Sequence, residues 1–216
     1  MGAVHRGDQA PGSTARPAAG RIGGAALPAI DYIQLTPDGR LFIGDRTKLE
    51  SYPYYGAEIH AAAGGPVVAV VDNLHDQVPG ANPTGLSLDE YRGNHIVQDI
   101  GGGSYAFYAH LKPGSIRVKV GDKLTTGQPI AALGNSGNSS APHLHFHVMS
   151  TPDPLMSNGL PFTFEKFRLD SRVASLDALS QLENTGGPVQ LQTGFPGGDQ
   201  ANVMPLDLDV MTYPTR

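Results

Sequence analysis

The sequence predicts an all-β protein built mainly from antiparallel sheets, with few short helices. Its 216 residues include 28 glycines and 18 prolines, whereas aromatic residues make up only 7% and tryptophan is absent. Short runs of β-branched and aromatic residues alternate along the chain with Gly-, Pro- and Asn-rich turns. This pattern favours many short strands over long helices. The length suits one medium-sized domain, or one domain with extended ends.

The first expected strands lie in the N-terminal half. The run AIDYIQL (29–35) is strand-like, and TPDGRLF (36–42) is expected to form a hairpin because its Asp-Gly pair is a strong turn signal. PVVAVVDN (66–73) is apolar and β-branched, which is typical of a buried strand. The prolines and glycines of 76–93 oppose regular structure, and the length of this loop suggests a rim or a lid.

A second group of elements follows. NHIVQDI (94–100) and YAFYAHL (105–111) flank three glycines and predict a hairpin. SIRVKVGDKLTTGQPIAAL (115–133) predicts two more strands. Nearer the C-terminus, SLDALSQLE (175–183) predicts a short helix capped by its first serine, and PLDLDVMTYP (205–214) predicts a final edge strand.

These elements divide the chain into three parts. Residues 1–26 are rich in Gly, Ala and Pro and are expected to form an extended N-terminal arm. Residues 27–170 carry most of the strand signals and form the main β domain. Residues 171–216 are expected to be a C-terminal extension packed on that domain.

Charge and composition exclude several classes of protein. The net charge is -5 with a pI near 5.8, and no basic stripe is present, so nucleic acid is not an expected partner. The absence of cysteine excludes disulfides and thiolate metal sites. No apolar run approaches the ~18 residues of a transmembrane segment. The first twenty residues contain no apolar core of a signal peptide, so none is visible.

The most informative stretch is APHLHFHVM (141–149), in which three histidines alternate with apolar residues. In a strand, His143, His145 and His147 share one face, while the intervening Leu, Phe and Val face a core. Neighbouring residues of one face lie roughly 6.5–7 Å apart, so two imidazoles can converge on one small site. The outer pair is about 13 Å apart, which predicts unequal roles for the three.

Two stretches of the sequence resemble a known family. YAHL (108–111) and the segment from VKVGD to HLHFHV (118–148) resemble the core of lysostaphin-type zinc metallopeptidases, most of which are peptidoglycan endopeptidases. The resemblance is strongest over 93–149 and extends over 29–170. The VKVGDKLTTGQPIA turn also resembles biotinyl and lipoyl carrier domains. A carrier needs an exposed acceptor lysine at a tight hairpin tip, typically flanked by methionine, and this tip is not seen here.

The family resemblance implies a role for each histidine of the motifs. By that resemblance His110 and His143 are catalytic and His145 binds Zn²⁺. Zinc held by three protein ligands keeps a fourth position open for water, lowers the pKa of that water and polarises the scissile carbonyl. The two catalytic histidines would orient the water, move its proton and stabilise the oxyanion.

A His and an Asp, usually four residues apart, complete the zinc site in this family. The familiar spacing would put the pair at Tyr54 and Glu58, of which only Glu58 could bind zinc. Asp31 is the better candidate, because an Ala-Ile-Asp segment before a DGRLF-like hairpin occurs in one branch of the family. Position i−4 from this aspartate is Leu27, so the accompanying ligand is assigned to His5, which belongs to an upstream His-Arg pair.

The resemblance therefore implies an extracytoplasmic zinc endopeptidase that cleaves peptidoglycan cross-bridges or stem peptides. The alternative is a degenerate member. If His5 does not bind the metal, only Asp31 and His145 remain, and the protein would be a cell-wall-binding or amidase-activating module. Metal content separates the two hypotheses.

The remaining histidines are expected to have lesser roles. His147 is expected to support the site or line the groove, and His95 to face the same groove. His60 is expected at the surface or the rim of the site, and His75 in solvent. The loop Gly134–Gly137 is expected to form a wall of the cleft.

Overall fold

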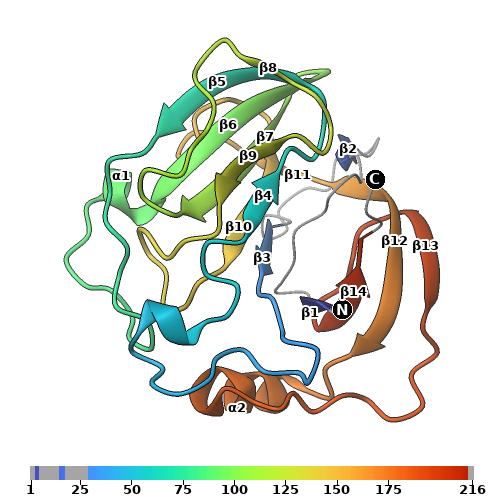
Figure 1. The fold of residues 1–216 in the computed structure, drawn as a ribbon. Coiled ribbons are helices and arrows are strands. Elements are labelled where there is room, and N and C mark those ends of the chain that lie inside the picture. Colours follow the sequence, from blue (N-terminus) through green and yellow to red (C-terminus); the bar gives the residue numbers. More distant parts are fainter. Residues whose placement is uncertain (1–2, 5–14, 18–28, 214–216) are drawn as a thin grey trace.

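The structure is a computed structural model that describes residues 3–4, 15–17 and 29–213 (Figure 1). Its largest sheet has seven strands, all paired antiparallel. These strands are β3 (Ala29–Tyr32), β5 (Gly65–Val71), β6 (Asn94–Gly101), β7 (Ser104–Leu111), β8 (Lys123–Leu124), β10 (Leu144–Met149) and β11 (Gly159–Leu160). Their order is β11-β10-β7-β6-β5-β8, and β3 pairs with β10. The central strand β7 thus lies between β6 and the histidine strand β10.

A second sheet has five strands and is also antiparallel. Its strands are β1 (Ala3–Val4), β2 (Ala15–Pro17), β12 (Phe162–Arg172), β13 (Gly198–Val203) and β14 (Asp209–Thr212). A separate pair consists of β4 (Glu58–His60) and β9 (Pro129–Ala132). In Figure 1 the seven-stranded sheet fills the upper left, and the sheet around β12 lies at the right.

The helices are short, as the composition predicts. They are a 3-10 turn at Leu49–Ser51, α1 (Leu88–Tyr91) and α2 (Leu176–Thr185). Ser175 caps α2 by accepting a hydrogen bond from the backbone of Ala178, and Gly186 ends the helix in the left-handed conformation. None of the helices in the described part of the chain is long and apolar enough to cross a membrane.

The two sheets share one aromatic core. The ring of Phe146 on β10 packs edge-on against Phe162 with centroids 5.3 Å apart, and Phe164 packs against Tyr213 at 5.2 Å. The hydroxyls of Tyr32 and Tyr213 are hydrogen-bonded at 2.7 Å, which satisfies both polar groups inside the core. Burying each such ring contributes about 1.5–3 kcal/mol, so this core fixes the sheets against each other.

A second core joins the C-terminal part to the segment after β3. Leu179 and Leu182 of α2 and Val210 of β14 pack with Ile33 and Phe42, and all five side chains are buried. The segment that follows the Asp31 strand is therefore fixed by the C-terminal region. The expected boundary at residue 170 falls inside β12, whose strand continues to Arg172.

The structure confirms the all-β class and several elements. The expected strands at 66–73, 94–100 and 105–111 correspond to β5, β6 and β7. The expected strand 29–35 is shorter, since β3 ends at Tyr32. The extended N-terminal arm contributes β1 and β2 to the second sheet.

Two expectations in the first half are wrong. The segment 36–42 forms the expected turn, closed by Gly39 N–H donating to the Thr36 carbonyl at 2.8 Å, but its flanks are not paired strands. The backbone N–H of Leu41 instead donates to the Gly186 carbonyl at 2.8 Å. The loop 76–93 contains the short helix α1, because Ser87 and Glu90 form a reciprocal capping box that compensates the loop composition.

One expectation in the second half is confirmed and one needs correction. Two strands, β8 and β9, form within 115–133 as expected, and they follow a turn in which Asp122 accepts from the Lys119 backbone at 3.0 Å. In 205–214 the strand starts at Asp209, after a turn in which Leu206 N–H donates to the Asp209 carboxylate at 2.9 Å. This strand is not an edge, because β1 pairs with its outer side.

Candidate active site

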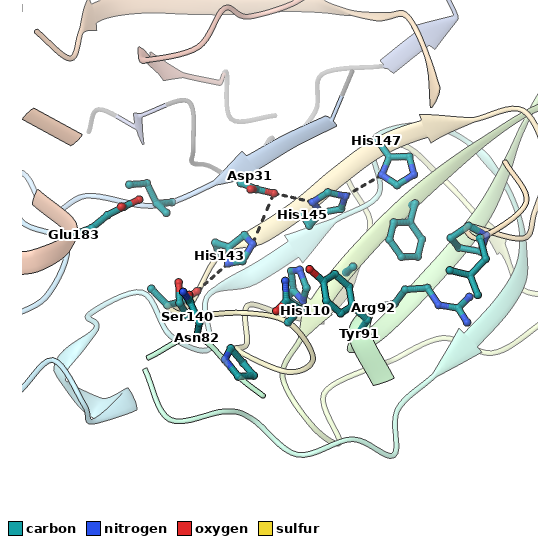
Figure 2. Close-up of a pocket in the computed structure, with 18 residues that line it drawn as sticks. Asp31, Asn82, Tyr91, Arg92, His110, Ser140, His143, His145, His147 and Glu183 are labelled. Atoms are coloured by element: carbon teal, nitrogen blue, oxygen red, sulfur yellow. Dashed lines mark hydrogen bonds and ion pairs between the residues drawn. The ribbon is translucent and has the colours of Figure 1, made fainter. Parts of the chain in front are cut away.

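A cavity of about 430 Å³ gathers most of the candidate residues at the open face of β10 and β7 (Figure 2). Asp31 lines it together with His110, His143, His145 and His147. These residues come from three different strands and the loop before β10. The structure thus brings together the two histidines expected to be catalytic, His110 and His143, and the expected ligands Asp31 and His145.

The sheet register explains this convergence. His145 is the direct partner of Asp31 on β3 and of Ala109 on β7. Because side chains two apart share a face, His147 points to the same side as His145. His143, immediately before the strand, continues the row, and Figure 2 shows His143 and His145 beside Asp31, with His147 beyond His145.

His110 has an unusual backbone for a strand residue. Its φ is 61°, in the left-handed region that non-glycine residues rarely adopt. The side chain is 7% exposed, and Nδ1 donates to the Ser136 carbonyl at 2.7 Å. Since a carbonyl only accepts, Nδ1 carries the proton and Nε2 holds a lone pair. Burial and the neighbouring His143 and His145 lower the pKa of His110 well below its usual value, so the ring is neutral at pH 7.

His143 is held in the same tautomer. Its Nδ1 donates to the Ala141 carbonyl at 2.8 Å and lies 3.0 Å from the Ser139 hydroxyl. That hydroxyl is 2.6 Å from Asn135 Oδ1, to which it donates, so it accepts from the imidazole. The ring centroids of His143 and His110 are 4.6 Å apart. The structure therefore sets two imidazoles side by side, each with its Nδ1–H bonded to a backbone carbonyl.

Asp31, His145 and His147 form a hydrogen-bonded chain. His145 Nδ1 donates to Asp31 Oδ1 at 2.7 Å, and its Nε2 lies 3.0 Å from His147 Nδ1. Burial alone would raise the pKa of Asp31, but the hydrogen bond from His145 and the nearby imidazoles outweigh it and hold the pKa well below the usual value. Burial and the adjacent His145 lower the pKa of His147 to about 3. Hydrogen bonds thus link the Asp31 carboxylate through His145 to His147.

The donors fit part of a zinc site. Asp31 and His145 offer carboxylate oxygen and imidazole nitrogen, both common zinc ligands, on adjacent strands. His143 Nε2 also lies 3.7 Å from Asp31 Oδ1. Within residues 29–213 and the two short described segments, no group of three or more potential ligands is arranged to hold a metal ion. His5 and Leu27 lie outside the described residues.

The other candidate residues lie elsewhere. Glu58, from the alternative spacing, forms an ion pair with Arg117 at 2.7 Å on β4 and does not line the cavity. His60 faces Glu58, with Nε2 3.7 Å from its carboxylate. His75 is exposed, as expected. His95 was expected to face the groove, but it is 4% exposed and packs against Phe107 instead.

Sequence reasoning missed several residues that shape the site. Ser139 supports His143, and the Ser136 carbonyl holds His110, although their loop was expected only to form a cleft wall. The loop 76–93 lines the cavity, as its length suggested, and it contributes Arg92. Glu183 reaches the cavity from α2. No local pattern marks these residues, because they meet the histidines only through the fold.

Comparison with known proteins finds one family and several relatives. Residues 52–157 match peptidase family M23. Over 98 residues the chain is 35% identical to the glycyl-glycine endopeptidase ALE-1 of Staphylococcus capitis, which covers 45% of this chain and 25% of the relative. Over 65 residues it is 37% identical to the peptidoglycan DD-endopeptidase ShyA of Vibrio cholerae, covering 30% and 15% respectively. The chain thus spans a quarter or less of these curated relatives.

The solved structures that resemble this chain have lower sequence identity to it than these two relatives. The catalytic domain of lysostaphin from Staphylococcus simulans matches with a TM-score of 0.38 and 22% identity, over 68% of this chain and 84% of that one. The family match includes His110, His143 and His145, but it begins after Asp31.

Proposed function

Since this chain belongs to peptidase family M23, we propose that it hydrolyses peptide bonds in peptidoglycan cross-bridges or stem peptides, with zinc as cofactor. One observation carries the proposal. The Asp31 carboxylate and His145 Nδ1 converge at 2.7 Å beside the rings of His110 and His143, whose centroids are 4.6 Å apart. The two relatives named above act, by their names, on glycyl-glycine and peptidoglycan DD bonds.

The proposed zinc ligands are Asp31, His145 and, from the N-terminal segment, His5. Bound there, zinc would supply a Lewis acid that polarises a carbonyl and makes water more acidic. The ionised state of Asp31 suits this role, because a carboxylate must be deprotonated to bind a metal.

The chain's own residues would handle the protons. With Nδ1 protonated and bound to a carbonyl, the Nε2 atoms of His110 and His143 can each accept a proton. One imidazole takes the proton of the water whose oxygen adds to the peptide carbonyl carbon. A protonated imidazole then donates to the amide nitrogen as the C–N bond breaks, which returns the pair to its starting state. Such acid–base assistance is worth typically 10²–10⁴-fold in rate.

The cellular location follows from the proposed substrate. Peptidoglycan lies outside the cytoplasmic membrane, so we propose an extracytoplasmic place of action. The substrate peptide is the partner that the cavity would accommodate.

The small number of converging metal donors among the described residues favours a second function. Asp31 and His145 are the only pair of converging donors in the expected ligand set that the structure describes, and two ligands hold zinc weakly. On this alternative the protein is a degenerate member that binds cell-wall peptide or activates an amidase.

Metal content and hydrolysis together test the proposal. We expect the purified chain, after incubation with zinc and desalting, to retain about one zinc and to clear peptidoglycan in a zymogram. His145→Ala should lose both properties, whereas His143→Ala should lose activity but keep zinc. His75→Ala, at an exposed position, is the control and should behave as the wild type.

Three outcomes would count against this assignment. Failure of the wild type to retain zinc favours the degenerate alternative. Equal clearing by His145→Ala and wild type would mean that His145 is not required. Loss of zinc in His143→Ala would show that the division of roles between the two histidines is wrong.

A further inference from the structure

Arg92 is the only lysine or arginine among the described residues that line the histidine cavity. It follows α1 and precedes β6, and its side chain is 18% exposed. Figure 2 shows Arg92 on the side of His110 and His147, away from Glu183. The cavity therefore has a cation toward one end and carboxylates, those of Asp31 and Glu183, toward the other.

The guanidinium of Arg92 has donors to spare. Nη2 donates to Asp89 Oδ1 at 2.7 Å. Nη1 lies 3.9 Å from Asp153 Oδ1, which is within ion-pair range but too long for a hydrogen bond. Nε is buried and has no hydrogen-bond partner among the described residues. Nη1 and Nη2 together carry four N–H groups and Asp89 accepts from one of them, so two parallel N–H groups can still bind a carboxylate.

The two neighbouring aspartates do not prevent Arg92 from binding a further carboxylate. Asp89 is 87% exposed and Asp153 is 55% exposed, so water screens the attraction of both for the arginine. The approach of Asp153 without a hydrogen bond indicates that a carboxylate can come near Nη1.

The position of Arg92 is fixed relative to the catalytic pair. The Tyr91 carbonyl accepts from Asn138 N–H at 2.9 Å, and Gly93 packs directly on the backbone of Ser136. The Ser136 carbonyl in turn accepts from His110. A substrate carboxylate bound by Arg92 would therefore be held at a fixed distance from His110, which would position the peptide bond to be cleaved.

Resting on the proposed function, we propose that Arg92 binds a carboxylate of the substrate peptide and so selects carboxylate-bearing stem peptides over neutral oligoglycine bridges. A planar guanidinium suits a carboxylate because two parallel N–H groups match its two oxygens. The residues inside an oligoglycine bridge have no carboxylate, so they cannot form this ion pair with Arg92. The Glu183 carboxylate at the other end of the cavity would repel the same substrate group and so favour one direction of binding.

Binding of a matched pair of peptides tests this inference. The probes are a fluorescein-labelled stem tetrapeptide with a free C-terminal carboxylate and the same peptide with a C-terminal amide. Both are titrated by fluorescence anisotropy against zinc-incubated His143→Ala, so that turnover cannot interfere. We expect the free acid to bind about ten- to a hundredfold more tightly, and Arg92→Gln in the same background to abolish the difference.

Two control variants separate charge from architecture. Asp89→Asn removes the partner of Arg92 but keeps the guanidinium, and it should preserve the preference for the acid. Arg117 also forms an ion pair with a carboxylate but lies outside the cavity. Arg117→Gln should therefore leave the affinities for the acid and for the amide unchanged.

The inference is overturned if the acid and the amide bind equally, or if neither binds at millimolar concentration. It is also overturned if Arg92→Gln weakens both peptides to the same extent, since that would be a structural effect. The proposed function fails separately, when the wild type binds the acid selectively but hydrolyses neither the peptides nor peptidoglycan.

Discussion

Asp31 lies directly opposite His145 on the neighbouring strand, and the imidazole Nδ1 donates to the carboxylate at 2.7 Å. The two residues are 114 positions apart in the chain, and only the pairing of β3 with β10 brings them together. The same register lines up His147 behind His145 and His110 beside it. Four consequences of this arrangement can be measured.

The first concerns His147, whose Nδ1 lies 3.0 Å from His145 Nε2. A metal bound by His145 through Nδ1, the nitrogen that faces Asp31, would leave the ring proton on Nε2, which could then donate to His147 and fix the ring. His147→Phe removes this group, and we expect zinc affinity to fall about ten- to a hundredfold. His147→Gln keeps an acceptor and should lose less. Competition with a chromogenic chelator measures both values, and equal affinity in the wild type and the Phe variant would exclude the role.

The second concerns the hydroxyl of Ser139. It accepts from His143 Nδ1 at 3.0 Å and donates to Asn135 Oδ1 at 2.6 Å, so it helps to fix the tautomer and orientation of His143. In Ser139→Ala we expect kcat/KM to fall about tenfold, corresponding to the loss of one hydrogen bond, with unchanged zinc content. Ser180→Ala, which removes an exposed hydroxyl on α2 outside the cavity, is the control. A Ser139→Ala enzyme as active as this control would contradict the role.

The third concerns two glycines with nearly the same backbone. Gly93 has φ +65°, and a Cβ there would meet the Ser136 carbonyl at 2.4 Å, whereas Gly114 has φ +67° with nothing within 4 Å. Gly114→Ala should cost about 1 kcal/mol of unfolding free energy from backbone strain alone. Gly93→Ala should cost at least twice as much and lower activity, because Ser136 holds His110. Urea denaturation of both variants measures this, and equal losses would show that the close contact is relieved without cost.

The fourth concerns stability and pH. His95 is 4% exposed and its Nδ1 donates to the Gly93 carbonyl at 2.7 Å. Burial lowers its pKa, partly opposed by the Gly93 carbonyl and assisted by the charge of Arg92. The folded state therefore takes up this proton at lower pH than the unfolded chain, whose pKa is about 6.5. The contribution to stability is present above pH ~6.5 and is lost as the pH falls below it.

The measurement for His95 is a pH series of urea denaturation. His95→Asn, which cannot titrate but keeps a donor, should lose less stability between pH 7 and pH 5 than the wild type. The difference is limited to about 1.4 kcal/mol per pH unit for one group. His75→Ala, at an exposed site, should follow the wild-type curve. Parallel curves for wild type and His95→Asn would contradict the prediction.

Much of the site could be anticipated because its signals are local. Alternation alone put His143, His145 and His147 on one face, and the family resemblance added His110 and Asp31. The structure gathers all five around one cavity. Ser139 and Arg92 could not be anticipated, because a serine in a polar loop and an arginine after a short helix carry no local pattern that distinguishes them from surface residues.

The sequence by itself determined the class of fold, the strands of the central sheet and the histidines available for chemistry, since side-chain alternation and turn residues act over a few positions. Tertiary structure decided which groups meet. Pairing of β3 with β10 set Asp31 against His145, and packing of the Ser136 loop on Gly93 placed Arg92 in the wall of the cavity that His110 and His143 also line. Such contacts depend on strand register and close packing across the whole chain, which no local pattern encodes.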